Sequence, residues 1–271
     1  MCELAIVGEA AGAVLAPIPF VEHTVAAHRH PAKEVVAGDV IAAVALHPAR
    51  DGWWRLVPGG AVADVVIGVD GDELVAVSAE PPGEGPRNHG DAPLADRSTH
   101  GDRIVLGGAS DLQDVLVEWK LLMAAQLVGL AARALAMGIE YAKDRKQFGR
   151  PIGGFQAVQH GLAECVPLVE GARLLARKAA WARDRGGDGR REGDEDGEDA
   201  AVLASMAFAF ATEVASTTTK RALQYHGAYG FSAEYDIQLY YRRARGWPLA
   251  LWGAGTERQR LADRLWPRVE R

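Results

Sequence analysis

One segment, residues 141–152, gathers side chains suited to holding an anion and a flat ring; it reads Tyr-Ala-Lys-Asp-Arg-Lys-Gln-Phe-Gly-Arg-Pro-Ile. The guanidinium of Arg145 can grip a diphosphate with two hydrogen bonds, Gln147 adds an amide, and Phe148 offers the face of a ring. A plainer alternative, which composition alone favours, is a basic helix end that complements its own dipole. The segment therefore predicts either an anion-binding helix end or a simple terminus.

A second segment, residues 224–231, places an amide beside a glycine turn and reads Gln-Tyr-His-Gly-Ala-Tyr-Gly-Phe. Glycine lets backbone approach a ligand closely, and the Gln224 amide could donate to a phosphate oxygen. The plainer alternative is an ordinary C-cap turn at the end of a helix. We expect His226 to be an exposed turn histidine.

A third segment, residues 253–258, reads Gly-Ala-Gly-Thr-Glu-Arg and leads into the last expected helix. Thr256 is predicted to be the N-cap of that helix. Three large rings lie near this segment, and we expect them in core or subunit contacts rather than around a pocket: Trp247, Trp252 and Trp266.

Composition excludes several classes of protein. The 271 residues carry a formal net charge of -6, so the basic footprint of a nucleic-acid-binding protein is absent. Two cysteines, Cys2 and Cys165, have no metal-binding spacing and suit a reducing cytoplasm, where we expect the protein. Cys165 is predicted to be a small buried hydrophobe.

Several chemical motifs are missing from the sequence. It lacks the Gly-x-Gly-x-x-Gly, Glu-x-x-His and Gly-x-Ser-x-Gly patterns of dinucleotide-binding, di-iron and hydrolase sites. The N-terminus makes a poor signal peptide, and the apolar stretch 201–211 is too short to cross a bilayer. We therefore expect no membrane partner and no metal.

The first part of the chain predicts short helices followed by a small β module. Two helices are expected between residues 3 and 28, joined at a bend that contains Pro17 and Pro19. From about residue 40 to 106, β-branched runs at 62–69 and 73–78 are separated by turn residues. Residues 81–86 contain three prolines and two glycines and predict a loop.

The second part predicts a bundle of long helices. The first of them should run from Leu112 to Phe148, where Gly149 and Pro151 end it. Pro167 should kink or break the second helix, and the acidic stretch 183–199 should be a solvated loop. The remaining helices are expected over 155–185, 199–225, 234–243 and 255–269. The fold class is thus α+β, mainly α.

In this order and spacing, the motifs resemble the acyl-CoA dehydrogenase family over residues 112–268, especially its C-terminal helical domain. The matching stretches are Gly129 to Leu135, Tyr141 to Gly149, Phe155-Gln156, Gln224-x2-Gly227-x2-Gly230, Tyr241-Arg242 and Gly255-Thr256. More loosely, residues 7–19 resemble the last helices of the family's N-terminal domain. The resemblance implies a truncated N-terminal helical remnant (1–39), a shortened β-domain (40–108) and a C-terminal helical bundle (109–271).

The resemblance also implies a chemistry and shows where this chain departs from it. In the family, a carboxylate removes the α-proton of an acyl thioester while a hydride passes to the flavin. That base immediately precedes the Gly-Thr pair, where this chain has Ala254; a subset of the family places it at the position of Trp119. Glu118 is adjacent, and its plainer interpretation is a surface carboxylate. The flavin-ring segment is replaced here by residues 45–48, Ala-Leu-His-Pro.

What the resemblance preserves is the part that holds the ADP portion of a neighbouring subunit's FAD. The implied FAD-binding residues are Arg145, Gln147, Phe148, Ile152, Gln224, Tyr225, Gly227, Ala228 and Thr256. Ala228 replaces the second glycine of the family's Gln-x-x-Gly-Gly pattern, which should crowd the cofactor slightly. We expect His160 to be packed or hydrogen-bonded rather than catalytic.

The leading hypothesis is a non-catalytic subunit of a heteromeric acyl-CoA dehydrogenase. This group, known from actinobacterial enzymes that desaturate steroid side-chain CoA thioesters, implies a heterotetramer with a full-length catalytic partner that binds most of the acyl-CoA. Electron-transfer flavoprotein would be the acceptor. Two alternatives stay open: an autonomous homo-oligomeric dehydrogenase with a displaced base such as Glu118, and a flavin-free helical assembly protein.

Overall fold

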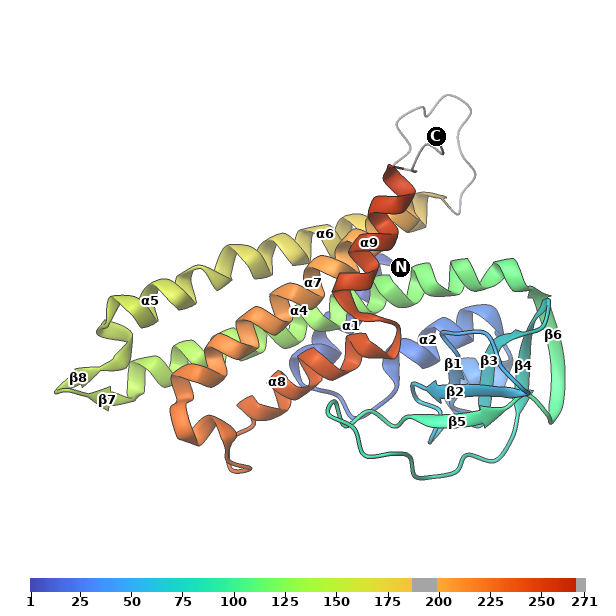
Figure 1. Cartoon of the computed structure of the whole chain (residues 1–271), viewed down its shortest axis with the longest axis horizontal. Coiled ribbons are helices and arrows are strands. Elements are labelled where there is room, and N and C mark those ends of the chain that lie inside the picture. Colours follow the sequence, from blue (N-terminus) through green and yellow to red (C-terminus); the bar gives the residue numbers. More distant parts are fainter. Residues whose placement is uncertain (187–198, 267–271) are drawn as a thin grey trace. The chain divides into compact units, whose positions relative to one another are not determined.

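A computed structural model describes residues 1–186 and 199–266 (Figure 1). The chain forms two compact units. A helical unit comprises Met1–Ala16, Lys120–Pro248 and the segment from Trp252 onward, and a β unit comprises Pro17–Trp119 with Leu249–Leu251. The α+β, mainly α class is confirmed. The three domain ranges 1–39, 40–108 and 109–271 remain a prediction.

Long helices rich in alanine build the helical unit. They are α1 (Cys2–Ala13), α4 (Leu112–Asp144, of which residues from Lys120 belong to this unit), α5 (Gln156–Ala163), α6 (Cys165–Gly186), α7 (Ala200–His226), α8 (Ile237–Gly246) and α9 (Gly253–Leu265). Short 3-10 helices, η2 (Ile152–Gly154), η3 (Gly227–Phe231) and η4 (Trp247–Ala250), connect them. Alanine is the most frequent buried residue of α7, and small side chains of this kind allow the close packing of α6 against α7.

Helix α1 lies against α4 through glycines. A methyl group on Gly12 would lie 1.9 Å from the Gln126 carbonyl oxygen, and one on Gly129 would lie 1.8 Å from that of Glu9. The two backbones therefore touch where each helix has no side chain. The buried face of α1 consists of Ala5, Gly8 and Gly12, which explains how so short a helix packs this tightly.

The structure corrects the end of the first long helix. Helix α4 ends at Asp144, not at Phe148, and the chain then turns through two short paired strands, β7 (Lys146–Gln147) and β8 (Arg150–Pro151). Gly149 has the left-handed backbone that was predicted to cap the helix, with φ 78°, but it serves the turn between these strands.

The other helices lie near their predicted positions. The predicted break near Pro167 is confirmed: α5 ends at Ala163, and Pro167 lies in the first turn of α6, where a missing N–H is tolerated. Asp199 caps α7 by accepting hydrogen bonds from the amides of Ala201 and Val202. Helix α8 begins three residues later than predicted, at Ile237. Most of the acidic stretch, 187–198, and residues 267–269 lie outside the described residues.

The β unit holds two helices and two small sheets. The helices are α2 (Phe20–Arg29) and α3 (Lys33–Ala37), the strands β1 (Ala42–Val44), β2 (Trp53–Val57), β3 (Val65–Asp70), β4 (Glu73–Ser78), β5 (Ala95–Ser98) and β6 (Asp102–Gly108), and η1 spans Ala109–Asp111. One sheet has the order β1-β3-β4-β6 and the other pairs β2 with β5. The turn predicted between the β-branched runs 62–69 and 73–78 joins β3 and β4 as antiparallel neighbours, and the predicted loop at 81–86 is confirmed.

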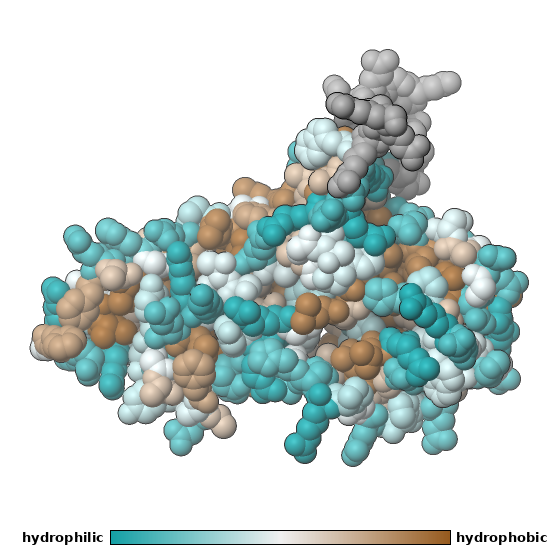
Figure 2. Space-filling model, in the orientation of Figure 1, coloured by the Kyte–Doolittle hydropathy of each residue, from teal (hydrophilic) through white to brown (hydrophobic). Residues whose placement is uncertain are grey.

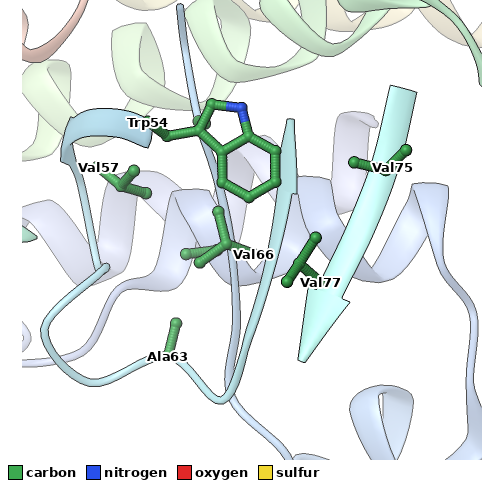
Figure 3. Packing of buried hydrophobic residues seen from close by; sticks show 8 residues of the cluster. Trp54, Val57, Ala63, Val66, Val75 and Val77 are labelled. Atoms are coloured by element: carbon green, nitrogen blue, oxygen red, sulfur yellow. The ribbon is translucent and has the colours of Figure 1, made fainter. Parts of the chain in front are cut away.

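Trp54 is the centre of the β unit's core (Figure 3). Its ring is fully buried against Val66, Val75 and Val77, and its indole N–H donates to the Val69 carbonyl oxygen at 2.8 Å. A methyl group on Gly68 would lie 2.7 Å from the ring, so glycine makes room for the indole. The core thus rests on one large ring among small β-branched side chains.

Two helical segments, Ala109–Asp144 and Ala200–Phe231, are long and apolar enough to cross a membrane by length and composition. The apolar stretch 201–211, which was predicted to be too short to cross a bilayer, lies within the second of these longer segments. Of their most apolar windows, 72% and 50% are buried inside the protein. Core helices of water-exposed proteins meet the same criterion, so this finding is weak evidence for a membrane.

Candidate functional site

Two of the predicted binding segments meet at one end of the helical unit, where β7 and β8 lie in Figure 1. The ring of Tyr141, near the end of α4, stacks on the ring of His226 at the end of α7, with centroids 4.2 Å apart. Tyr141 also donates its hydroxyl to the His226 carbonyl oxygen at 3.4 Å. The structure therefore brings Tyr141 and His226, one from each segment, into contact, although they are far apart in sequence.

The β7–β8 turn projects its functional groups outward. Phe148 is 92% exposed and has the left-handed backbone, with φ 51°, which is uncommon for a residue other than glycine. Arg145, Gln147 and Arg150 are exposed as well. The turn is closed by a hydrogen bond of 2.8 Å from the Ile152 amide to the Arg145 carbonyl oxygen. Apolar surface is visible at this end of the helical unit (Figure 2).

The glycine turn after α7 leaves backbone accessible. Gly227 has φ 62°, and nothing lies within 4 Å of the point where a side chain would begin. Gln224, Gly227 and Ala228 are exposed, and Tyr225 is half-buried with its hydroxyl directed to the Ala157 carbonyl oxygen of α5 at 3.4 Å. The break from helix to glycine turn is confirmed.

This donor set fits the nucleotide end of a dinucleotide cofactor such as FAD. Exposed guanidinium groups suit a diphosphate, exposed amides suit its remaining oxygens, and an exposed aromatic ring suits a purine. Open space around Gly227 allows close approach of the ligand to the backbone.

Thr256 does not join this site. It is exposed on α9, which runs beside the earlier part of α7 through ion pairs of Arg258 with Glu213 and of Arg264 with Asp199. Twelve residues of helix separate Glu213 from Tyr225, about 18 Å along α7. The N-cap prediction is also wrong, because α9 begins at Gly253 and Thr256 lies inside its first turn.

A buried ion pair that sequence reasoning missed lies close to Ala254. The Glu257 side chain is 1% exposed and accepts from Lys120 Nζ at 2.6 Å and from the Trp252 indole N–H at 2.5 Å. Lys120 also donates to the Ser205 hydroxyl at 3.1 Å. Burial lowers the pKa of Lys120, and Glu257 partly offsets this effect. The lysine at position 120, within the apolar sequence of α4, is the feature from which a buried ion pair could have been predicted.

Glu118 is not the surface carboxylate that was expected. Within the β unit it is 6% exposed, and its two oxygens lie 2.9 Å from Arg29 Nη2 and 3.2 Å from His28 Nδ1. Its neighbour Trp119 is fully buried and donates its indole N–H to Glu22 at 3.2 Å. Burial raises the pKa of Glu22, and the Trp119 hydrogen bond lowers it less. A carboxylate already paired with the Arg29 guanidinium is a poor acceptor for a substrate proton.

Residues 45–48 offer few groups to a flavin ring. The side chains of Ala45 and Leu46 are buried in the β unit. The amide of Ala45 donates to the Ile67 carbonyl oxygen and that of Ala49 to Val69, at 2.7 and 2.8 Å. Within this segment the Ala45 amide is therefore occupied by a hydrogen bond, and Pro48 has no N–H to donate.

Of the other predictions for single residues, some are confirmed and others are wrong. His226 is 5% exposed, so the prediction of an exposed histidine is wrong, whereas Cys165 is fully buried as predicted. His160 is exposed on α5 rather than packed. Trp247 and Trp252 are half-buried, and Trp266 is 73% exposed. Among the residues that the structure describes, no cluster of three potential metal ligands occurs.

Comparison with known sequences identifies relatives over most of the chain. The model of the acyl-CoA dehydrogenase C-terminal domain matches residues 107–262. The chain is 32% identical to acyl-CoA dehydrogenase IpdE2 of Mycolicibacterium smegmatis, across 91% of this chain and 73% of that protein. It is 36% identical to benzylmalonyl-CoA dehydrogenase of Aromatoleum aromaticum, but over only 55% of this chain and 36% of that protein.

Solved structures share the fold. The ChsE4-ChsE5 complex from Mycobacterium tuberculosis contains a chain with a TM-score of 0.85 and 24% identity, covering 99% of this chain and 81% of that one. A variant of the Tcur3481-Tcur3483 steroid ACAD gives a TM-score of 0.79 at 26% identity, covering 97% and 80%. The folds of these proteins therefore match this chain over almost its whole length.

Proposed function

The chain belongs to the acyl-CoA dehydrogenase family, and from that premise we propose that it is the non-catalytic subunit of a heteromeric, FAD-dependent enzyme. It donates the ADP-binding half of an FAD site to a full-length partner that carries the base and the flavin-ring contacts. The observation that carries this proposal is the exposure of Arg145, Gln147 and Phe148 on the segment whose Arg145 lies over the Tyr229 ring, two residues after the open turn at Gly227.

A division of labour follows from the residues of this chain. When bound, FAD accepts the hydride that leaves the acyl-CoA. Arg145 and Gln147 hold and orient its diphosphate from outside the partner's active site, while Ala254 has no group that takes a proton. The partner then supplies proton abstraction and binds most of the acyl-CoA.

The relatives support a heteromeric enzyme with a bulky substrate. Two structural neighbours are described as ChsE4-ChsE5 and Tcur3481-Tcur3483, each joining two proteins, and the second is described as a steroid ACAD. We extend this to a steroid side-chain CoA thioester as substrate, a tetramer with two copies of each subunit, and electron-transfer flavoprotein as the acceptor.

The test is the ultraviolet-visible spectrum and native mass of the chain alone and with the full-length dehydrogenase encoded beside it. We expect a colourless chain alone and a yellow heterotetramer with two flavins. A chain that is yellow alone and is bleached by an acyl-CoA would overturn the subunit role in favour of an autonomous enzyme.

Arg145→Ala in the complex tests the half-site itself. Loss of a charge-assisted contact to the diphosphate should weaken FAD binding about tenfold or more, measured by flavin fluorescence during dialysis. Arg87→Ala removes an equally exposed arginine from the Pro- and Gly-rich loop of the β unit and should leave FAD affinity unchanged. Unchanged FAD affinity in Arg145→Ala would instead favour the flavin-free assembly protein.

A further inference from the structure

We propose that Tyr229 is a positioning residue that holds the Arg145 guanidinium in place for the cofactor diphosphate. The inference rests on the proposed function and deepens it, since it names a residue to which neither the sequence motif nor the relatives assign a role. The juxtaposition that carries it is the guanidinium of Arg145 over the ring of Tyr229, with 5.5 Å between the guanidinium carbon and the ring centroid.

Arg145 needs such a support because it is exposed. It lies one residue beyond the end of α4, and a long exposed side chain samples many rotamers that an ordered contact must suppress. A ring face attracts a guanidinium, while the in-plane N–H groups of a stacked guanidinium still point outward to an anion. Tyr229 therefore limits where Arg145 goes without using the donors that a diphosphate needs.

Tyr229 is itself supported by a connected group of rings. Its centroid lies 5.6 Å from that of Tyr235, which in turn lies 6.1 Å from His226 and 6.3 Å, edge-on, from Tyr141. With the stack of Tyr141 on His226, these four rings come from α4, α7, η3 and the loop before α8. Offset and edge-on contacts at these distances are attractive.

His226 anchors the group in the core. It is 5% exposed, and its Nδ1 lies 2.8 Å from the Ala222 carbonyl oxygen. A carbonyl only accepts, so the proton resides on Nδ1, which sets the ring orientation. Tyr141 lies about one helical turn before Arg145, and its ring stacks on His226, which directly precedes Gly227. The ring group therefore holds Arg145 near the glycine turn.

The experiment compares Tyr229→Leu with Tyr229→Phe in the complex with the full-length dehydrogenase, with FAD as the titrated ligand. Leucine removes the ring face and should weaken FAD binding about threefold to tenfold. Phenylalanine keeps the face and should retain affinity within about twofold, because the hydroxyl plays no part in the contact with Arg145. Native mass and circular dichroism verify that each variant assembles.

A double-mutant cycle with Arg145→Ala separates positioning from general disturbance of the turn. If Tyr229 acts through Arg145, Tyr229→Leu should cause almost no additional loss when Arg145 is already alanine. Independent, multiplying effects would overturn the positioning role, as would an unchanged FAD affinity in Tyr229→Leu. If Arg145→Ala alone leaves FAD affinity unchanged, the proposed function fails instead, and the two failures are thereby distinguished.

Discussion

Phe148 illustrates how one backbone angle changes what a motif presents. The sequence identifies the residue types around it, but a helical pattern through Phe148 would have packed that ring against the preceding turn. The structure gives Phe148 a left-handed backbone and 92% exposure, and the three residues before it leave the helix. Gly149 and Pro151 indicate that the helix ends, but their positions do not distinguish a C-cap from a turn between two strands.

Buried charge was the least predictable property at this scale. Glu118 meets Arg29 from 89 positions away, and Glu257 meets Lys120 from across the helical unit. Local patterns describe neighbours along a helix, so partners supplied by another element leave no periodic signal. The residue types at Arg145, Gln147 and Gln224 allowed an anion-binding interpretation. Composition alone favoured a plain helix end, however, and the assignment of these residues to FAD came from the family resemblance.

Glu22 should make stability depend on pH. Burial raises its pKa above the ordinary 4.5, so the folded chain retains a proton that the unfolded chain releases. The contribution of Glu22 to the free energy of unfolding should therefore be fully present below pH 4.5 and be lost as the pH rises through its folded-state pKa. Glu22→Gln cannot ionise and still accepts from Trp119, so its stability relative to the parent should increase as the pH rises above 4.5.

Denaturant titrations at several pH values measure this difference directly. Glu34→Gln, at an exposed position on α3, is the matched control. A difference between Glu22→Gln and the parent that does not change with pH would show that Glu22 is ionised in the folded state.

At the scale of elements, the start of helix α4 was predicted correctly but its end was not, and both ends of α7 were predicted to within one residue. Alanine and leucine patterns define both helices, and Asp199 marks the start of α7. The small strands β1, β2, β5 and β6 were not individually predicted. Short strands such as β1, with three residues, carry too few alternations to stand out.

The Lys120–Glu257 pair should join α4 and α9 by electrostatics. Lys120→Met leaves the Glu257 carboxylate buried without its cation and should destabilise folding by about 3–5 kcal/mol. Adding Glu257→Gln removes the uncompensated charge while keeping an acceptor for Trp252, so the double variant should recover much of that loss. Urea unfolding measures the stability of Lys120→Met, Glu257→Gln and the double variant. A loss in the double variant equal to the sum of the two single losses would contradict the pairing.

For the whole molecule, the order of segments along the chain differs from their grouping in space. Helix α1 and the later helices form one unit, and the β unit lies between them in sequence. The sequence predicted each group of elements but assigned α1 to an N-terminal remnant with α2. The contact between Gly12 and Gln126 could not be predicted, because a glycine within an apolar helix does not reveal which other backbone approaches it.

Gly129→Ala tests the close contact of α1 with α4. The new methyl group would lie 1.8 Å from the Glu9 carbonyl oxygen, so α1 must shift, and we expect a loss of about 1–3 kcal/mol by denaturant unfolding. Gly171→Ala on α6 meets only ordinary contact at 3.5 Å and should stabilise the helix by about 0.5–1 kcal/mol. Equal effects in the two variants would show that the α1 contact is not tight.

The separation of α1 from α4 along the sequence also determines how long α1 lacks its packing partner during synthesis. Gly12 leaves the ribosome more than a hundred residues before Gln126 and Gly129, its contact surface on α4. At about 5–20 residues per second, this leaves α1 without its docking partner for several seconds to about half a minute. The intervening β unit has that interval to fold, whereas α1, with only 12 residues, is too short to form a stable helix until α4 emerges and packs against it.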